Sequence, residues 1–195
     1  MTEGLSAPAS GGRRRAELLA DIAASAIPYS GPLRDVSEFR EYAALNRPSI
    51  LRRVAADLAA EVPRDAGGLV AAGWRAAVLA TALSLHTGLP LSVATGPEAG
   101  PAGVAAVGGD GLAPGRSVAL VTTSTAGDAE VGAWVAGLAE LGIRVVGVLS
   151  LLAPAARDRT AQGRPAGDGG TGSSPPRTAL LTEEELAVST SGGRP

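Results

Sequence analysis

The stretch Gly115–Gly127, GRSVALVTTSTAG, decides the fold predicted for this chain. Residues 117–122 form an apolar run that predicts a buried strand, and residues 123–128 form a tight loop. Residues 129–141 then predict a helix, and 143–152 a second apolar strand. Together they form a complete strand–helix–strand unit, and such units build parallel sheets.

The same alternation occurs earlier in the chain. Residues 69–72 and 91–94 read as short buried strands, separated by a helix over 74–86. The following segment, 96–115, holds seven glycines and three prolines, which predicts a flexible loop around a short strand at 104–107. We therefore expect an α/β fold with a mainly parallel central sheet flanked by helices.

Helical patterns precede the first strand. Residues 13–26 place Leu18, Leu19, Ile22 and Ala26 on one face. Asp35 and Glu38 have the spacing of a capping box for a short helix that reaches Leu45, and 49–61 predicts a longer amphipathic helix.

This pattern divides the chain into one domain and looser segments. We expect a flexible leader at 1–12, the domain at 13–153, and disorder or a long surface loop at 154–177, which is rich in Gly, Pro and Ser. A strand and helix at 178–187 would pack on the same domain, before a flexible tail at 188–195.

Composition narrows the function classes. The 195 residues carry 17 basic and 19 acidic side chains, a net charge of −2, so nucleic acid is not an expected partner. Every basic residue is arginine, and the single His and absent Cys cannot build a zinc site. Charged residues interrupt every apolar run short of the roughly 18 to 20 residues of a membrane span, so we expect a cytoplasmic protein without membrane contact.

The segment 115–127 resembles the phosphoribosyl diphosphate motif of the type I phosphoribosyltransferases, which implies a phosphoribosyltransferase-like α/β fold. Residues 69–90, with the sequence TGLP near their end, 145–152 and 178–186 resemble further parts of the orotate branch of that family. The resemblance implies transfer of phosphoribose from phosphoribosyl diphosphate to orotate. The products would be orotidine monophosphate and pyrophosphate, in pyrimidine nucleotide biosynthesis.

The chain departs from that motif at its charged positions. The two acidic residues of the family fall on Thr122 and Thr123, which cannot carry negative charge. The segment 94–97 reads Ala, Thr, Gly, Pro where the family has an Arg and Lys pair, and the chain has no lysine. We therefore expect a catalytically impaired homologue that serves as a nucleotide-binding or phosphate-binding, regulatory or partner subunit. The alternative is an active or diverged phosphoribosyltransferase.

Two loops supply the candidate ligand-binding residues, and no catalytic or metal-binding residue is assigned. The phosphate-loop candidates are Thr122, Thr123, Ser124, Thr125, Ala126, Gly127 and Asp128. The pyrophosphate-loop candidates are Ala72, Gly73, Trp74 and Arg75. For the first loop an ordinary turn capped by Asp128 or Thr125 is equally consistent with the sequence. For the second, Arg75 is more simply a surface arginine.

Other conspicuous residues have simpler explanations. We expect His86 to be a polar residue at a helix end, Trp134 to pack in the core or at a subunit contact, and the run 183–185 to be a solvated first turn of a helix. The resemblance implies a homodimer, or a heterodimer with a related active subunit, and Mg²⁺ only if transfer survives. An unrelated dinucleotide-binding domain is disfavoured because no G-x-G-x-x-G follows the first strand.

Overall fold

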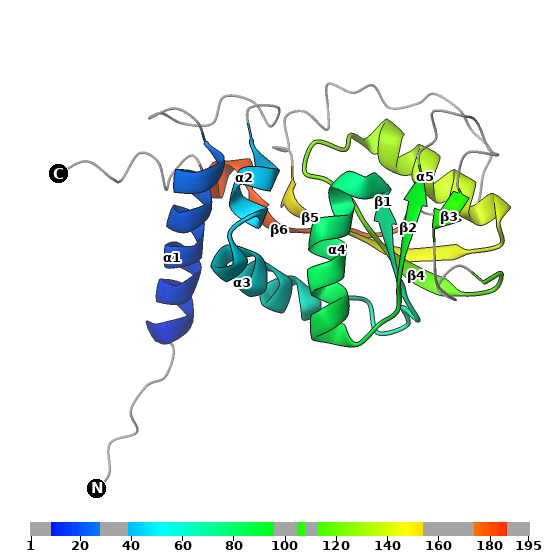
Figure 1. Ribbon diagram of the computed structural model, residues 1–195, viewed down its shortest axis with the longest axis horizontal. Helices are drawn as coiled ribbons and strands as arrows, with labels where there is room; N and C mark the ends of the chain where they lie inside the picture. The colour runs from blue at the N-terminus through cyan, green and yellow to red at the C-terminus, as the bar shows by residue number, and fades with distance from the viewer. Residues whose placement is uncertain (1–8, 28–38, 96–104, 108–112, 154–173, 187–195) are drawn as a thin grey trace, which may run out of the picture.

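The computed structural model describes residues 9–27, 39–95, 105–107, 113–153 and 174–186. Within them lies one six-stranded sheet in the order β3-β2-β1-β4-β5-β6 (Figure 1). The strands are β1 (Leu69–Ala72), β2 (Leu91–Thr95), β3 (Ala105–Val107), β4 (Ser117–Val121), β5 (Arg144–Ala153) and β6 (Arg177–Thr182). The helices are α1 (Ala9–Ala26), α2 (Glu41–Leu45), α3 (Pro48–Ala59), α4 (Gly73–Thr87) and α5 (Asp128–Glu140).

Five strands run parallel and one does not, which confirms the predicted mainly parallel α/β fold. β1 pairs in parallel with β2 and β4, β5 pairs in parallel with β4 and β6, and only β3 pairs antiparallel, along β2. The chain leaves β1 for β2 on one side and returns to β4 on the other. The order therefore reverses between β1 and β4, and crevices at such reversal points are frequent ligand sites in open α/β sheets.

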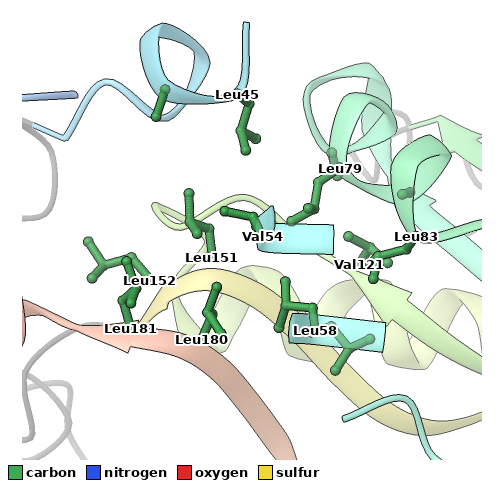
Figure 2. Packing of buried hydrophobic residues seen from close by; sticks show 14 of the residues in the cluster. Leu45, Val54, Leu58, Leu79, Leu83, Val121, Leu151, Leu152, Leu180 and Leu181 are labelled. Carbon is green, nitrogen blue, oxygen red and sulfur yellow. The ribbon is translucent and has the colours of Figure 1, made fainter. Parts of the chain in front are cut away.

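Helices cover both faces of the sheet because successive strand side chains point to opposite sides. On one face, α1 to α4 bury a large apolar cluster against Val121, Leu151 and Leu181, and Figure 2 shows α3 and α4 leucines meeting these strands. On the other face, α5 buries Trp134 and Leu138 against alternate residues of the central strands. In Figure 1, α5 accordingly lies on the side of the sheet away from α1, α2 and α3.

Glycine is required at two positions, the end of α4 and a close contact in β5. Gly88 ends α4 with a φ of 72°, a left-handed conformation that residues with a side chain rarely adopt. Gly147 lies in β5 beside Pro63, where an added Cβ would come within 2.6 Å of the proline Cγ. The second glycine therefore lets the segment before β1 pass close to the sheet.

Several boundaries differ from those predicted. α1 begins at Ala9, inside the predicted leader, although Gly11 and Gly12 have a low helix propensity; Leu18 and Ile22 anchor this helix in the core. β4 ends one residue early, at Val121, and β6 begins at Arg177. Segments 1–8, 28–38, 96–104, 108–112, 154–173 and 187–195 lie outside the described residues, and with them the predicted capping box and most of the two predicted loops.

Candidate functional site

The two candidate loops lie side by side at the carboxyl edge of the sheet. Ala71 of β1 pairs with Val121 of β4, so the turn entering α4 and the turn 122–128 leave neighbouring strand ends. Gly73 has a φ of 76°, which lets the chain turn from β1 directly into α4. The two segments thus lie at neighbouring strand ends, at the point where the strand order reverses.

The turn 122–128 alternates between buried and outward-facing residues. Thr122, Ser124 and Ala126 are buried, with exposed fractions of 0%, 1% and 2%, whereas Thr125 and Asp128 are exposed and Thr123 and Gly127 partly so. The hydroxyls of Thr123 and Thr125 lie 3.3 Å apart on the outward side. Of the seven candidates, the side chains open to a ligand are therefore those of Thr123, Thr125 and Asp128.

Thr122 points into the protein because it continues the alternation of β4. Its hydroxyl is buried and has no hydrogen-bond partner in the described part of the chain. An unpaired buried hydroxyl normally costs stability. The candidate assignment of Thr122 to ligand binding conflicts with the full burial of its side chain.

Ser124 fixes the turn through both its side chain and its backbone. Its Oγ accepts a hydrogen bond of 3.1 Å from the Leu152 N–H, which ties the turn to the end of β5. Its own N–H donates to the Glu41 Oε2 at 3.0 Å. Burial raises the pKa of Glu41, and the hydrogen bonds from the Ser124 backbone and side chain only partly offset that effect. The Glu41 carboxylate therefore lies against the backbone of the turn 122–128.

Arg177 supports the turn from the opposite side. Its guanidinium donates to the Ala126 carbonyl at 2.7 Å and to the Asp128 Oδ1 at 3.0 Å. The ion pair compensates the negative charge that Asp128 brings to the start of α5. The predicted cap by Asp128 or Thr125 is wrong, because Gly127 is the N-cap residue and makes no side-chain capping bond.

The second loop contributes an exposed aromatic residue and an exposed cation. Trp74 is 62% exposed, and Arg75 is also exposed. Burial raises the pKa of Tyr42, the Glu41 carboxylate raises it further, and the Arg75 guanidinium lowers it. The Tyr42 hydroxyl is therefore influenced by the charges of both Glu41 and Arg75.

Magnesium does not fit the side chains that surround the turn. Mg²⁺ is held by carboxylates and substrate phosphates. Glu41 is hydrogen-bonded to Ser124 and Asp128 is paired with Arg177, while Thr122 and Thr123 carry no charge. In the described ranges, no three His, Asp or Glu residues are grouped as metal ligands.

Two other conspicuous residues, His86 and Trp134, lie outside the two candidate loops. His86 is exposed in the last turn of α4 and, with Leu85 and Arg52, borders a 440 Å³ cavity between α3 and α4. Trp134 is 3% exposed in the core, as predicted.

Among the described helices, none combines the length and the apolar character that crossing a bilayer requires.

The acidic run 183–185 is only partly solvated, contrary to expectation. Glu185 accepts a hydrogen bond from the Thr182 N–H at 2.9 Å and one from Arg15 at 2.7 Å. Thr182 and Glu185 have the T-x-x-E spacing of a capping box, so the sequence did hold a signal for this contact. Arg15 comes from the distant helix α1, and no sequence pattern indicated it.

Glu41 and Arg177 are the two site residues that sequence reasoning missed. Glu41 lies 83 positions before Ser124, and Arg177 lies 49 positions after Asp128. Neither residue belongs to a motif with fixed spacing. In the sequence alone, both look like ordinary charged surface residues. Only the packing of α2 and the pairing of β6 with β5 bring them to the turn.

Comparisons with known proteins show which folds this architecture is similar to. No protein-family model matches the chain, and no curated protein matches it. Solved structures, in contrast, match it over most of its length. Orotate phosphoribosyltransferase of Mycobacterium tuberculosis H37Rv, in complex with inorganic phosphate, is 19% identical over 88% of this chain and 90% of its own, with a TM-score of 0.58.

Two other solved structures extend the likeness. Leishmania donovani UMP synthase is 18% identical with a TM-score of 0.63, over 91% of this chain but 38% of its own length. Adenine phosphoribosyltransferase of Leishmania tarentolae is 16% identical with a TM-score of 0.54, over 78% of this chain and 80% of its own. The chain therefore has the fold shared by the orotate and adenine phosphoribosyltransferases.

Proposed function

We propose that this chain is an orotate phosphoribosyltransferase-like protein of the cytoplasm. It binds a phosphorylated sugar or nucleotide at the turn 122–128, acts as a regulatory or partner subunit, and lacks ordinary phosphoribosyl transfer. The observation that carries the proposal is the turn itself, which keeps the strand-to-helix geometry and hydroxyls but has neutral Thr122 and Thr123 at the acidic positions of the motif.

Ligand binding is supported by the donors that the turn presents. The first N–H groups of α5 have no partner within the helix, and Gly127 leaves them without a side-chain cap. Helix starts of this kind attract phosphate groups. The hydroxyls of Thr123 and Thr125 add hydrogen-bond donors on the outward side, and Arg177 compensates the charge of Asp128.

Impaired transfer is supported by the charges around the turn. A departing pyrophosphate needs cations, and the chain has no lysine. Arg177 is committed to Asp128 and to the Ala126 carbonyl. Loss of each charged group that stabilises a transition state costs roughly 2 to 4 kcal/mol, although such losses are not additive. Several such losses would lower the rate by many powers of ten.

The decisive experiment measures transfer and binding separately. The purified protein is incubated with orotate, phosphoribosyl diphosphate and Mg²⁺, and pyrophosphate release is followed beside an active orotate phosphoribosyltransferase as positive control. We expect no release above background. Calorimetric titration with ribose 5-phosphate and orotidine monophosphate should show saturable binding that Thr125→Ala weakens. Robust turnover would overturn impaired transfer, and absence of binding would overturn the ligand-binding role.

The alternative function, an active or diverged transferase, is supported by the fold alone. In that case the missing cations would come from another chain, and Mg²⁺ would enter with the substrate. A partner chain is also supported by α4, where Trp74 and Leu85 are 62% and 83% exposed. Sedimentation analysis of the protein alone and mixed with an active relative tests for the homodimer or heterodimer. Activity appearing only in the mixture would favour the alternative.

A further inference from the structure

The carboxylate of Glu41 already contacts the turn proposed to bind a phosphoryl group. Its Oε2 accepts the Ser124 N–H at 3.0 Å. Glu41 lies in the first turn of α2, whose later residues Ala44 and Leu45 are buried in the core. The contact joins residues 83 positions apart and is therefore a product of the tertiary fold.

We propose that Glu41 is a built-in occupant of the anion position in the turn 122–128, and that a phosphoryl group binds there only by displacing it. This inference rests on the proposed ligand-binding function. A carboxylate and the edge of a phosphate both present negative oxygens to the same N–H donor. Two such anions a few ångströms apart repel each other, so they cannot share the Ser124 N–H.

The surroundings of Glu41 favour exchange of the carboxylate for a ligand. Burial raises the pKa of Glu41 even though Ser124 hydrogen-bonds it, so the negative charge is less well stabilised there than in water. α2 has only five residues, and its N-cap residue Arg40 makes no side-chain capping bond. A phosphate has more oxygens to offer the neighbouring donors than a single carboxylate has.

Two variants of Glu41 and one matched control test the proposal. Glu41→Gln keeps the shape of the side chain and can still accept the Ser124 N–H, but it removes the charge. Glu41→Ala removes the occupant altogether. Glu140→Gln, at the exposed far end of α5, makes the same change in net charge away from the turn. Each protein is titrated calorimetrically with inorganic phosphate and ribose 5-phosphate at pH 7.5, after circular dichroism confirms its fold.

We expect Glu41→Ala to bind both probes about 10 to 100 times more tightly than the natural sequence, Glu41→Gln to gain less, and Glu140→Gln to be unchanged. In ¹⁵N-resolved spectra of the natural sequence and of Glu41→Gln, the Ser124 amide should shift on phosphate binding. Equal affinities for the natural sequence and both Glu41 variants would overturn this inference and leave the proposed function standing. If none of these proteins binds either probe, the proposed function fails as well.

Discussion

The substitution Arg177→Gln tests whether the candidate site depends on the cation behind the turn. The guanidinium donates 2.7 Å to the Ala126 carbonyl and 3.0 Å to Asp128. The Arg177 side chain is 19% exposed and that of Asp128 is 61% exposed, so solvent screens the ion pair, which contributes about 0.5 kcal/mol. The bond to the carbonyl is partly buried and charge-assisted, and contributes about 1.5 to 3 kcal/mol.

These contributions are partly offset, because the Arg177 Nε is buried without a partner among the described residues. We therefore expect Arg177→Gln to lower the free energy of unfolding by about 2 kcal/mol, which for a chain of this length lowers Tm by about 4 to 8 °C. Urea denaturation and differential scanning calorimetry measure the change. Arg144→Gln is the control, since its ion pair with Asp65 and its hydrogen bonds to the Ser117 hydroxyl are exposed and should together contribute less than about 1 kcal/mol.

Phosphate affinity gives a second measure of the same substitution. Arg177→Gln leaves the Asp128 charge uncompensated at the start of α5, so binding of ribose 5-phosphate should weaken. Asp128→Asn in the same chain should restore it, because the repelling charge is removed. If the double variant binds no better than Arg177→Gln, or if Arg177→Gln is as stable as Arg144→Gln, the supporting role assigned to Arg177 is wrong.

Further predictions concern packing and acid stability. Gly147→Ala should cost about 1 to 3 kcal/mol in urea denaturation, since the new Cβ would lie 2.6 Å from Pro63, whereas Gly132→Ala on the open side of α5 should stabilise the chain by about 0.5 to 1 kcal/mol. Thr122→Val should be about 1 kcal/mol more stable than the natural sequence, because it removes a buried unpaired hydroxyl, and a clear loss of stability would show that the hydroxyl has a partner. Burial would raise the pKa of Glu185. Hydrogen bonds from Arg15 and Thr182 nevertheless hold this pKa below the ordinary 4.5. That stabilisation is present above the ordinary pKa and is lost as the pH falls through the lowered one. Glu185→Gln should therefore reduce Tm at pH 7, and the difference in Tm should shrink as the pH falls below 4.5.

Local patterns predicted most of the framework. The apolar runs of β1, β2, β4 and β5 and the three- and four-residue spacing in α1 and α3 follow from burying one face, a requirement that the sequence itself displays. The strand–helix–strand unit around residue 122 indicated a parallel sheet for the same reason.

The contacts that give the candidate site its charge could not be predicted in this way. Glu41 and Arg177 reach the turn from elements distant in sequence, and their positions depend on how α2 and β6 pack. The burial of Thr122 likewise depends on where β4 ends and how the turn leaves it.

Hydrophobic periodicity thus determined by itself which segments became strands and helices, and residue identity determined that the turn has no carboxylate at Thr122 or Thr123. The tertiary structure alone decided that a carboxylate from α2 and a guanidinium from β6 flank that turn. The physical reason is that periodicity reports the face an element buries, whereas an ion pair or a hydrogen bond between distant residues forms only where the packed elements bring two side chains within about 3 Å.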